Sequence, residues 1–495
     1  MTKHIILSFL ILICGVFPSR SITVEVETPG TLSSLIENAG EETTLVVSGK
    51  IDASDFDFIN KNMDNLSTLD MRGITSIEPY EGKIIGNLTM HKANNIPSNI
   101  FAGKKLKKVV FPEIDGLVIN AGSFAFTEIT ELEIPSNVSY VGEGAFTGCA
   151  DLTTAKIGAA ELGIAALSNC TSLESVEFLK PTDVPANCFF NCSALKEIRG
   201  AKITSVGDKA FTGCKSLETF PFDASLASIG KEAFMQSGLQ KVDLSKCGAL
   251  TSVGDWAFAQ MPRLKTLNIG NIESMGTAIA FGCPALVSVK TSGNVAEISD
   301  FAFSKSEQID SVGLLHDGIE RIGRYAMSGL KGIKTITLPE SLTLLDDHAM
   351  ENMTGLEIIN SNLTVIPAVG ENVWEGIDQS AVKLFVPNAT VNDYKEADQW
   401  KEFTVLKNSS GVESVEGEVI SQLRARFDGD DLIIEANGVE INRIMMYNPA
   451  GQLLIAVEPL DETVVINTYG FGTRLFIIHA SLADGRTASL KLAKR

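Results

Sequence analysis

A short sequence phrase recurs through most of the 495-residue chain, and its period limits the possible folds more than any other feature. In its clearest copy, Gly207 precedes Ala210-Phe211, and Cys214 and Leu217 follow. The large apolar residue of successive copies returns at steps of 20 to 25 residues. These residues are Phe101, Phe126, Phe146, Leu167, Phe189, Phe211, Phe234, Phe258, Phe281, Phe303, Met327, Met350 and Trp374. A fixed period in this range indicates a solenoid in which each copy forms one coil.

Each copy also carries a strand pattern. A Leu or Ile shortly after the large apolar residue opens a short strand with apolar residues at its first, fourth and sixth places, as in Leu173-Val176-Phe178. A second short apolar segment, such as Ile203 to Val206, precedes the next glycine. One coil is therefore predicted to contain a strand, a turn, a brief strand, a tight glycine turn and a short helical or 3₁₀ piece. Because no coil can bury its own apolar edge, the coils are expected to stack around a continuous core.

The repeated pattern Ile-x-x-Ile-Gly-x-x-Ala-Phe-x-x-Cys-x-x-Leu-x-x-Ile-x-Leu-Pro resembles the BspA-like leucine-rich repeat. The resemblance covers residues 96–380. It implies a repeat solenoid of short β-strands, turns and short helical or 3₁₀ pieces. It also implies an exported protein that binds other macromolecules, similar to bacterial adhesins, without a catalytic site.

Charge and motifs argue against several classes of function. The formal net charge is −20, which disfavours nucleic acid because its phosphates would be repelled. The five histidines are scattered and none stands in a metal-ligand pair, and the fingerprints of hydrolases and nucleotide-binding loops are absent. We therefore expect no enzyme, no cofactor and no metal site.

The N-terminal end carries an export pattern. Lys3 precedes an apolar run that ends near Phe17, and small residues follow at Ser19 and Ser21, which predicts a signal peptide over residues 1–21. Cys14 leaves lipoprotein processing open as an alternative, although the residue before it is not small. No later run is long enough to span a membrane. Residues 22–95 are predicted to cap the solenoid, since a terminal coil exposes an unpaired strand edge.

Seven cysteines follow the signal peptide, and four of them share one position of the repeat. Cys149, Cys170, Cys192 and Cys214 stand three residues after the large apolar residue of successive coils. Equivalent positions in stacked coils form a ladder, where Cys serves as a small buried apolar side chain. Buried free thiols are the favoured interpretation. A disulfide stays open because adjacent coils are close enough, and a metal site is the weakest alternative.

Binding on a solenoid usually uses the side chains that point outward from the stacked strands. The third and fifth positions of the predicted strands form such an exposed row, which is polar, mixed in charge and without aromatic residues. The predicted ligand-binding residues of this row are Glu131, Glu133, Lys156, Glu177, Glu197, Arg199, Lys241, Asp243, Asn268 and Lys290. An ordinary solvated face is the alternative, because aromatic and arginine anchors are sparse.

The repeat ends before the C-terminus. Residues 381–406 are predicted to close the array with a strand, a helix over 391–400 and large aromatic side chains. Residues 407–422 are predicted to be a linker. Short strands with turn signals over 423–495 predict a small all-β sandwich domain. Its segment from Ile444 to Leu454 and its ending from Leu475 to Leu492 resemble the type IX secretion sorting domain, which implies a role in export.

Together these features predict an exported, non-enzymatic surface or envelope protein that binds host or microbial macromolecules in the manner of an adhesin. We expect its partner to be a surface protein or glycan. We expect a monomer at the cell surface, associated with the outer membrane or extracellular. Two alternatives stay open: an envelope spacer with no ligand of its own, and a secreted enzyme such as a glycosidase, which the missing catalytic motifs disfavour.

Overall fold

The computed structural model divides into two compact units, residues 1–408 and 409–495. The structure describes residues 20–84, 90–291, 294–310, 313 and 315–407 of the first unit. In the second unit it describes residues 423–428, 430–436, 439–448, 453–459, 461–469, 471, 475–483 and 487–493. The predicted signal peptide lies outside the described residues except for its last two, and so does the predicted linker except for Lys407.

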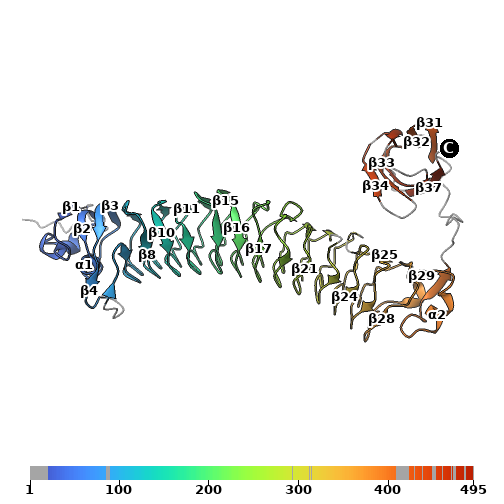
Figure 1. Cartoon of the computed structure of the whole chain (residues 1–495), viewed down its shortest axis with the longest axis horizontal. Helices are drawn as coiled ribbons and strands as arrows, with labels where there is room; N and C mark the ends of the chain where they lie inside the picture. The colour runs from blue at the N-terminus through green and yellow to red at the C-terminus, as the bar shows by residue number, and fades with distance from the viewer. Residues whose placement is uncertain are drawn as a thin grey trace, which may run out of the picture. The chain divides into compact units, whose positions relative to one another are not determined.

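The first unit is a β-solenoid of about 16 turns with little helix, whose coils follow one another in chain order (Figure 1). The predicted first strand of the repeat forms four parallel sheets. These sheets comprise β1 (Ser21–Val26), β2 (Thr44–Ile51), β3 (Thr68–Ile77) and β7 (Lys108–Val110); β9 (Glu131–Ile134), β11 (Thr154–Ile157), β13 (Ser175–Phe178) and β15 (Glu197–Gly200); β18 (Lys241–Asp243), β20 (Thr266–Asn268) and β22 (Ser288–Lys290); and β25 (Thr335–Leu338), β27 (Ile358–Ser361), β29 (Lys383–Val386) and β30 (Thr404–Lys407).

The brief strands before the glycine turns form a second row of parallel sheets. This row comprises β6 (Asn95–Ile96), β8 (Leu117–Ile119), β10 (Val138–Val141) and β12 (Glu161–Leu162); β14 (Thr182–Val184), β16 (Ile203–Val206), β17 (Ser228–Ile229), β19 (Ser252–Val253) and β21 (Ser274–Met275); and β23 (Glu297–Ile298), β24 (Arg321–Ile322), β26 (Leu344–Leu345) and β28 (Ala368–Val369). A small antiparallel pair, β4 (Tyr80–Glu81) and β5 (Met90–His91), stands apart from both rows.

The third side of each coil is a turn around the Ala-Phe pair. Two residues with left-handed backbone frame this pair, as Lys209 (φ 57°) and Gly213 (φ 76°) frame Phe211. Alternate backbone N–H groups donate to the next coil, so the N–H of Phe211 lies 2.8 Å from the carbonyl oxygen of Ala233. These bonds satisfy the backbone polar groups that strand pairing satisfies on the other two sides.

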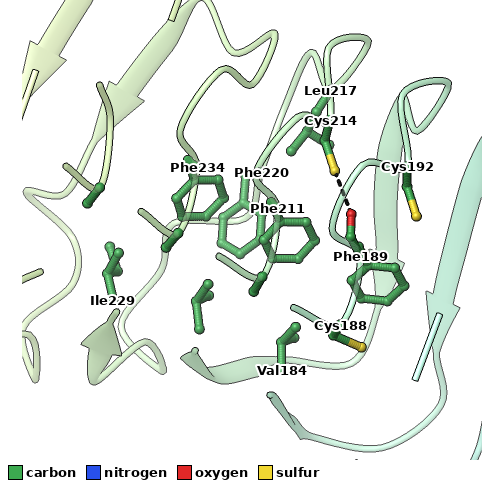
Figure 2. Close-up of a cluster of buried hydrophobic side chains, with 14 of the residues drawn as sticks. Val184, Cys188, Phe189, Cys192, Phe211, Cys214, Leu217, Phe220, Ile229 and Phe234 are labelled. Carbon is green, nitrogen blue, oxygen red and sulfur yellow. Dashed lines mark hydrogen bonds between the residues drawn. The ribbon is translucent and has the colours of Figure 1, made fainter. Parts of the chain in front are cut away.

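Aromatic rings from successive coils stack in the interior, as the repeat predicts. The rings of Phe189 and Phe211 lie 5.4 Å apart, those of Phe211 and Phe234 5.3 Å, and those of Phe234 and Phe258 5.6 Å, all nearly parallel. Figure 2 shows three of these rings in one file, with Val184 and Ile229 of the second strand row below them. One continuous apolar cluster runs from Val24 to Phe403.

Two predicted members of this file are wrong. Phe126 is 66% exposed, and its ring lies over Gly148, whereas Phe124 is fully buried and stacks on Phe146 at 5.5 Å. Phe281 is only partly buried, because Ile279 and Ala280 fill the interior of its coil. Each of these coils has two large apolar residues within two positions of each other, so the repeat pattern alone fits either one. In the first coil, Phe124 gives more even steps to Phe101 and Phe146 than Phe126 does.

The ends of the solenoid bury larger side chains and contain the helices. At the N-terminal end, α1 (Ala53–Asn62) starts with a capping box at Asp52, and the Asp55 carboxylate accepts hydrogen bonds from the N–H groups of Gly30 (2.7 Å) and Leu32 (2.9 Å). The 3₁₀ segments η1 (Leu32–Ser34) and η2 (Ala39–Glu41) precede it. This packing holds the loop after β1 against the first coils.

The C-terminal end contains η4 (Gln379–Ala381) and α2 (Val391–Glu396). The predicted helix through residue 400 ends four residues early, since Ala397 has an extended backbone. The ring of Trp400 nevertheless packs against the rings of Trp374 and Tyr394, with centroids 5.0 and 5.3 Å away. These aromatic side chains fill the end of the apolar core.

The second unit consists of two antiparallel sheets. They are β31 (Leu423–Asp428), β32 (Asp431–Ala436) and β35 (Thr463–Asn467), and β34 (Leu453–Val457), β33 (Ile441–Tyr447), β36 (Leu475–Leu482) and β37 (Thr487–Ala493). Buried residues of both sheets, such as Ile434 and Phe476, belong to one apolar cluster. The all-β fold predicted here is confirmed. β31 was not assigned from the sequence, although its apolar residues alternate with Arg424 and Arg426 as in a half-exposed strand.

Candidate functional site

The structure separates the predicted ligand-binding row into two groups. Six of its residues lie on the sheet of β9, β11, β13 and β15, and Lys241, Asp243, Asn268 and Lys290 lie on the sheet of β18, β20 and β22. Between the two sheets, the coil after Leu217 forms no strand. Pro221 in that coil has no N–H to donate to a neighbouring strand, which explains the break.

The first group lies along an open groove of about 730 Å³. The predicted residues Glu131, Glu133, Lys156, Glu177 and Arg199 line it. Four further charged residues that sequence reasoning missed also line it, namely Arg72, Lys107, Lys108 and Glu113. Lys108 belongs to β7 and Lys107 directly precedes it, and the place of this strand beside β9 is visible only once the coils are stacked.

Charges alternate across the floor of this groove. In the parallel register, Lys156 lies opposite Glu133 on one side and Glu177 on the other, and Glu177 lies opposite Arg199. The Lys156 Nζ is 3.8 Å from a Glu133 carboxylate oxygen. Arg199 pairs with Glu197, and this hydrogen bond raises the pKa of the Arg199 guanidinium. Such cross-strand pairs attract each other while keeping their charges accessible to solvent.

The groove is close to neutral on a strongly acidic chain. Its lining contains five cationic side chains and four carboxylates, a net charge of +1, whereas the whole chain has a formal charge of −20. Phe111 is the one aromatic residue of the lining, and it is buried. The described lining therefore offers charged and polar contacts, with little surface for stacking against a sugar ring.

The second group makes contacts within its own sheet. Asp243 accepts hydrogen bonds from Ser245 Oγ at 2.7 Å and from Asn268 Nδ2 at 3.1 Å. The bond from Ser245 lowers the pKa of Asp243. Lys241 and Lys290 remain exposed at the edges of this sheet. These residues do not line the groove.

A second hollow, of about 470 Å³, lies over the other strand row. Arg321 lies at its edge and contacts three carboxylates, those of Glu297, Asp300 and Asp346. Burial opposes the charge of Arg321, but the hydrogen bonds to Asp346 and Asp300 outweigh it and raise the pKa of the guanidinium. Because Arg321 joins acidic residues from the coils before and after its own, this cluster holds three successive coils together.

The cysteines form the predicted buried ladder. All seven described cysteines are buried free thiols. The Sγ of Cys214 donates to the carbonyl oxygen of Phe189 at 3.2 Å, as Figure 2 shows, and Cys149 bonds Phe124 in the same way at 3.3 Å. Burial raises the pKa of Cys149 to about 12. The thiolate is the reactive form, so these residues are suited to packing and not to catalysis.

The aromatic surface of the solenoid lies away from the predicted row. The left-handed residue before the Ala-Phe pair points outward, and in three successive coils it is Phe301, Tyr325 and His348. The ring of Tyr325 stacks on those of Phe301 at 5.1 Å and His348 at 4.5 Å. Trp256, at the same position in an earlier coil, packs against Phe281 at 5.1 Å. The repeat spacing of these residues is the sequence signal that would have revealed the stack.

Parallel strands that pair from coil to coil around a leucine-rich core define a leucine-rich-repeat solenoid. The family model of the BspA type leucine rich repeat region, in 6 copies, matches residues 94–201, 182–310 and 308–383. Since these matches span more than half of the 495 residues, the chain belongs to this family. No curated protein matches the chain.

Several solved structures are similar to the chain. A leucine-rich repeat protein from Bacteroides ovatus is 16% identical, with a TM-score of 0.49, over 79% of this chain and 91% of that one. A leucine rich cell surface protein from Faecalibacterium prausnitzii is 21% identical, with a TM-score of 0.30, over 50% of this chain and 83% of that one. The pneumococcal vaccine antigen PcpA is 13% identical, with a TM-score of 0.30, over 80% of this chain and 90% of that one.

The described part of the chain contains no helix with the length and apolar character needed to cross a membrane.

Proposed function

We propose that the chain is an exported, non-enzymatic surface protein that binds a host or microbial macromolecule through the groove over β7, β9, β11, β13 and β15. The groove carries this proposal, because it is a near-neutral surface of alternating charge on a chain of net charge −20. The net negative charge of the chain opposes an acidic partner, whereas in the groove such a partner meets cations from four coils. Family membership supports a repeat scaffold that binds other proteins.

The expected contact is broad and polar, with a strong dependence on salt. Exposed ion pairs contribute little individually, so affinity must come from many contacts along the groove. A protein or charged glycan long enough to span several coils fits this surface. The apolar signal pattern over residues 1–21 supports export. The domain over 423–495 is proposed to direct sorting to the cell surface.

The test is a binding assay of the full chain against host matrix proteins and glycans, with two matched double variants. Lys156→Glu with Arg199→Glu changes two cations of the groove, whereas Lys241→Glu with Lys290→Glu makes the same charge change on the neighbouring sheet. Binding is expected to weaken at least tenfold for the groove pair and by less than twofold for the control pair. Equal weakening by both pairs would show that overall charge, not the groove, governs binding.

The envelope spacer and the secreted enzyme remain the competing functions. Failure of the full chain to bind any partner, together with a cell-surface location on fractionation, favours the spacer. Turnover of a glycan by the purified chain favours the enzyme. Fractionation of cells that produce the full chain or a chain lacking 423–495 tests the sorting role, because loss of that domain is expected to remove the protein from the surface.

A further inference from the structure

Three potential metal ligands converge on the outer side of two neighbouring coils near the C-terminal end of the solenoid. The Nδ1 of His348 lies 3.2 Å from a carboxylate oxygen of Glu351 and 3.5 Å from one of Glu375. All three atoms lie within 4.8 Å of one another. The side chains of His348 and Glu351 are 20% and 18% exposed, and that of Glu375 is 56% exposed. Among the described residues, no second group of three histidine, cysteine or acidic side chains meets this spacing.

The repeat itself brings these residues together. His348 occupies the left-handed position of its coil (φ 56°), and Glu351 follows three residues later. Glu375 occupies the position of Glu351 in the next coil. The backbone N–H of Asn352 donates to the Glu375 carbonyl oxygen at 2.7 Å, and the N–H of His348 donates to Glu371 at 2.9 Å. The inter-coil bonds therefore hold the three side chains on rigid backbone, as a preformed site requires.

Neighbouring groups orient the ligands. The ring of Tyr325 stacks on the imidazole with an interplanar angle of 4°, which fixes the plane of the His348 ring. The side-chain amide of Asn352 donates to Glu351 Oε1 at 2.8 Å, while Glu351 Oε2 faces the imidazole. Such second contacts commonly orient the ligands of a metal ion.

The arrangement of acceptors calls for a positive charge between them. The Nδ1 of His348 is buried and makes no hydrogen bond within the described structure, although two carboxylate oxygens lie close by. In neutral histidine the bare ring nitrogen is an acceptor, and carboxylate oxygens are acceptors only. When Nδ1 carries no proton, three acceptors face one another, and either a proton on Nδ1 or a metal ion between them relieves the repulsion.

We propose that His348, Glu351 and Glu375 bind a divalent transition-metal ion of the zinc class. In a tetrahedral site with metal–ligand bonds of about 2.0–2.1 Å, neighbouring ligand atoms are about 3.3 Å apart, and the two measured separations from Nδ1 bracket this value. One imidazole nitrogen and two carboxylate oxygens suit Zn²⁺ better than Ca²⁺, which prefers oxygen ligands only. The fourth position is left for water or for a ligand from a partner.

The test is metal binding by the full chain after treatment with a chelator. Zn²⁺ is titrated in competition with a chromophoric chelator, and Co²⁺ is added separately to record the visible bands of tetrahedral cobalt. The variants are His348→Asn and Glu375→Gln. Asparagine occupies the same left-handed position at Asn187 and Asn372, so His348→Asn preserves the backbone. His316→Asn and Glu371→Gln are the matched controls, and thermal unfolding in metal-free buffer checks that every variant folds.

The expected result is one Zn²⁺ per chain with a tetrahedral Co²⁺ spectrum. Glu375→Gln is expected to weaken Zn²⁺ binding at least tenfold, and His348→Asn to abolish the Co²⁺ bands, while both controls match the unchanged chain. Zn²⁺ is also expected to raise the unfolding temperature of the unchanged chain and the controls, but not of His348→Asn. Absence of Zn²⁺ binding at micromolar metal, or binding by the folded His348→Asn variant equal to that of its controls, would overturn the proposal.

Discussion

Two stretches of the solenoid place their aromatic rings on opposite sides of the turns around the Ala-Phe pair, one inside the core and one on the surface. Between Phe189 and Phe258 the rings stack inside, 5.3 to 5.6 Å apart. Between Phe301 and His348 a second stack forms outside, with centroids 4.5 to 5.1 Å apart. The two positions are two residues apart in the repeat, and both are spaced by the coil-to-coil backbone bonds. Ring stacking therefore follows from coil spacing, whereas the position within the coil decides whether a ring supports the core or the surface.

Replacing one ring in each stack gives the largest expected difference. Phe211→Ala leaves a void among Phe189, Phe220 and Phe234 and is expected to lower the free energy of unfolding by about 3–5 kcal/mol. Phe301→Ala removes a ring that is already 36% exposed and is expected to cost about 1 kcal/mol or less. Urea unfolding of both variants measures the difference. Similar costs for the two would show that the outer stack is part of the core.

Replacing a turn glycine with alanine should lower the free energy of unfolding by a similar amount in both stretches, because in both this turn lets neighbouring coils approach closely. A β-carbon at Gly254 would lie 2.5 Å from the carbonyl carbon of Gly230, and one at Gly323 in the second stretch would lie 2.8 Å from the backbone nitrogen of Asp300. Either change to Ala is expected to lower the free energy of unfolding by about 2–3 kcal/mol, as crowding of this kind does. Gly248→Ala is the matched control, since nothing lies within 4 Å of its added carbon. Unequal losses at Gly254 and Gly323 would mean that coil spacing differs between the stretches.

Alkaline pH should weaken the coils just before the first stretch through their buried thiols. The folded pKa of Cys149 is raised to about 12 by burial, so the thiol is protonated in the folded chain when it ionises in the unfolded one. Its stabilising contribution is therefore complete below about pH 8.5 and falls by about 1.4 kcal/mol for each pH unit from there toward its folded pKa.

Cys149→Ser is expected to reduce this pH dependence by the same amount. Serine at the equivalent position keeps the inter-coil bond, as Ser306 Oγ donates to the Ala280 carbonyl oxygen at 2.8 Å. The measurement is urea unfolding at several values from pH 8 to 11, with Cys283→Ser reporting on a coil between the two stretches. An unchanged slope in Cys149→Ser would contradict the assignment of this dependence to the buried ladder.

Charge changes on the strand row should have the smallest effect on folding. Lys156→Glu and Lys290→Glu each alter an exposed side chain, and each is expected to change the free energy of unfolding by less than about 1 kcal/mol. Thermal unfolding at low and high salt measures both. A larger loss at Lys156 that disappears at high salt would show that the alternating charges of the groove hold the coils together, in addition to any role in binding.

Much of the solenoid was predictable because the same pattern of apolar, small and glycine residues recurs in many coils. The strand patterns, the interior file and the cysteine ladder all follow from positions that recur with the period, and the structure confirms them. Single positions were less certain. Phe126 and Phe281 each lie within two residues of the true interior position. An even repeat step favours Phe124, whereas only stacking against neighbouring coils shows that Ala280 occupies this position in its coil.

The candidate sites were predictable only in part. The outward row of Glu131 to Arg199 follows from strand alternation, but Arg72 and Lys107 join it through contacts between coils that no local pattern reveals. The separation of Lys241 and Lys290 from the groove depends on one coil that forms no strand. The C-terminal strands follow from their alternation of apolar and polar residues, and β31 shows the same alternation although it was not assigned from the sequence.

The sequence by itself determined that this chain must stack, because coils of 20 to 25 residues cannot bury their apolar edges alone. It also determined which side of each strand faces the core, since alternation is a local property. Only the tertiary structure decided which residues of different coils meet. Charges at Lys156 and Arg199, and the ligand atoms of His348 and Glu375, come together because backbone bonds set the register between coils, and register is a property of the assembled stack.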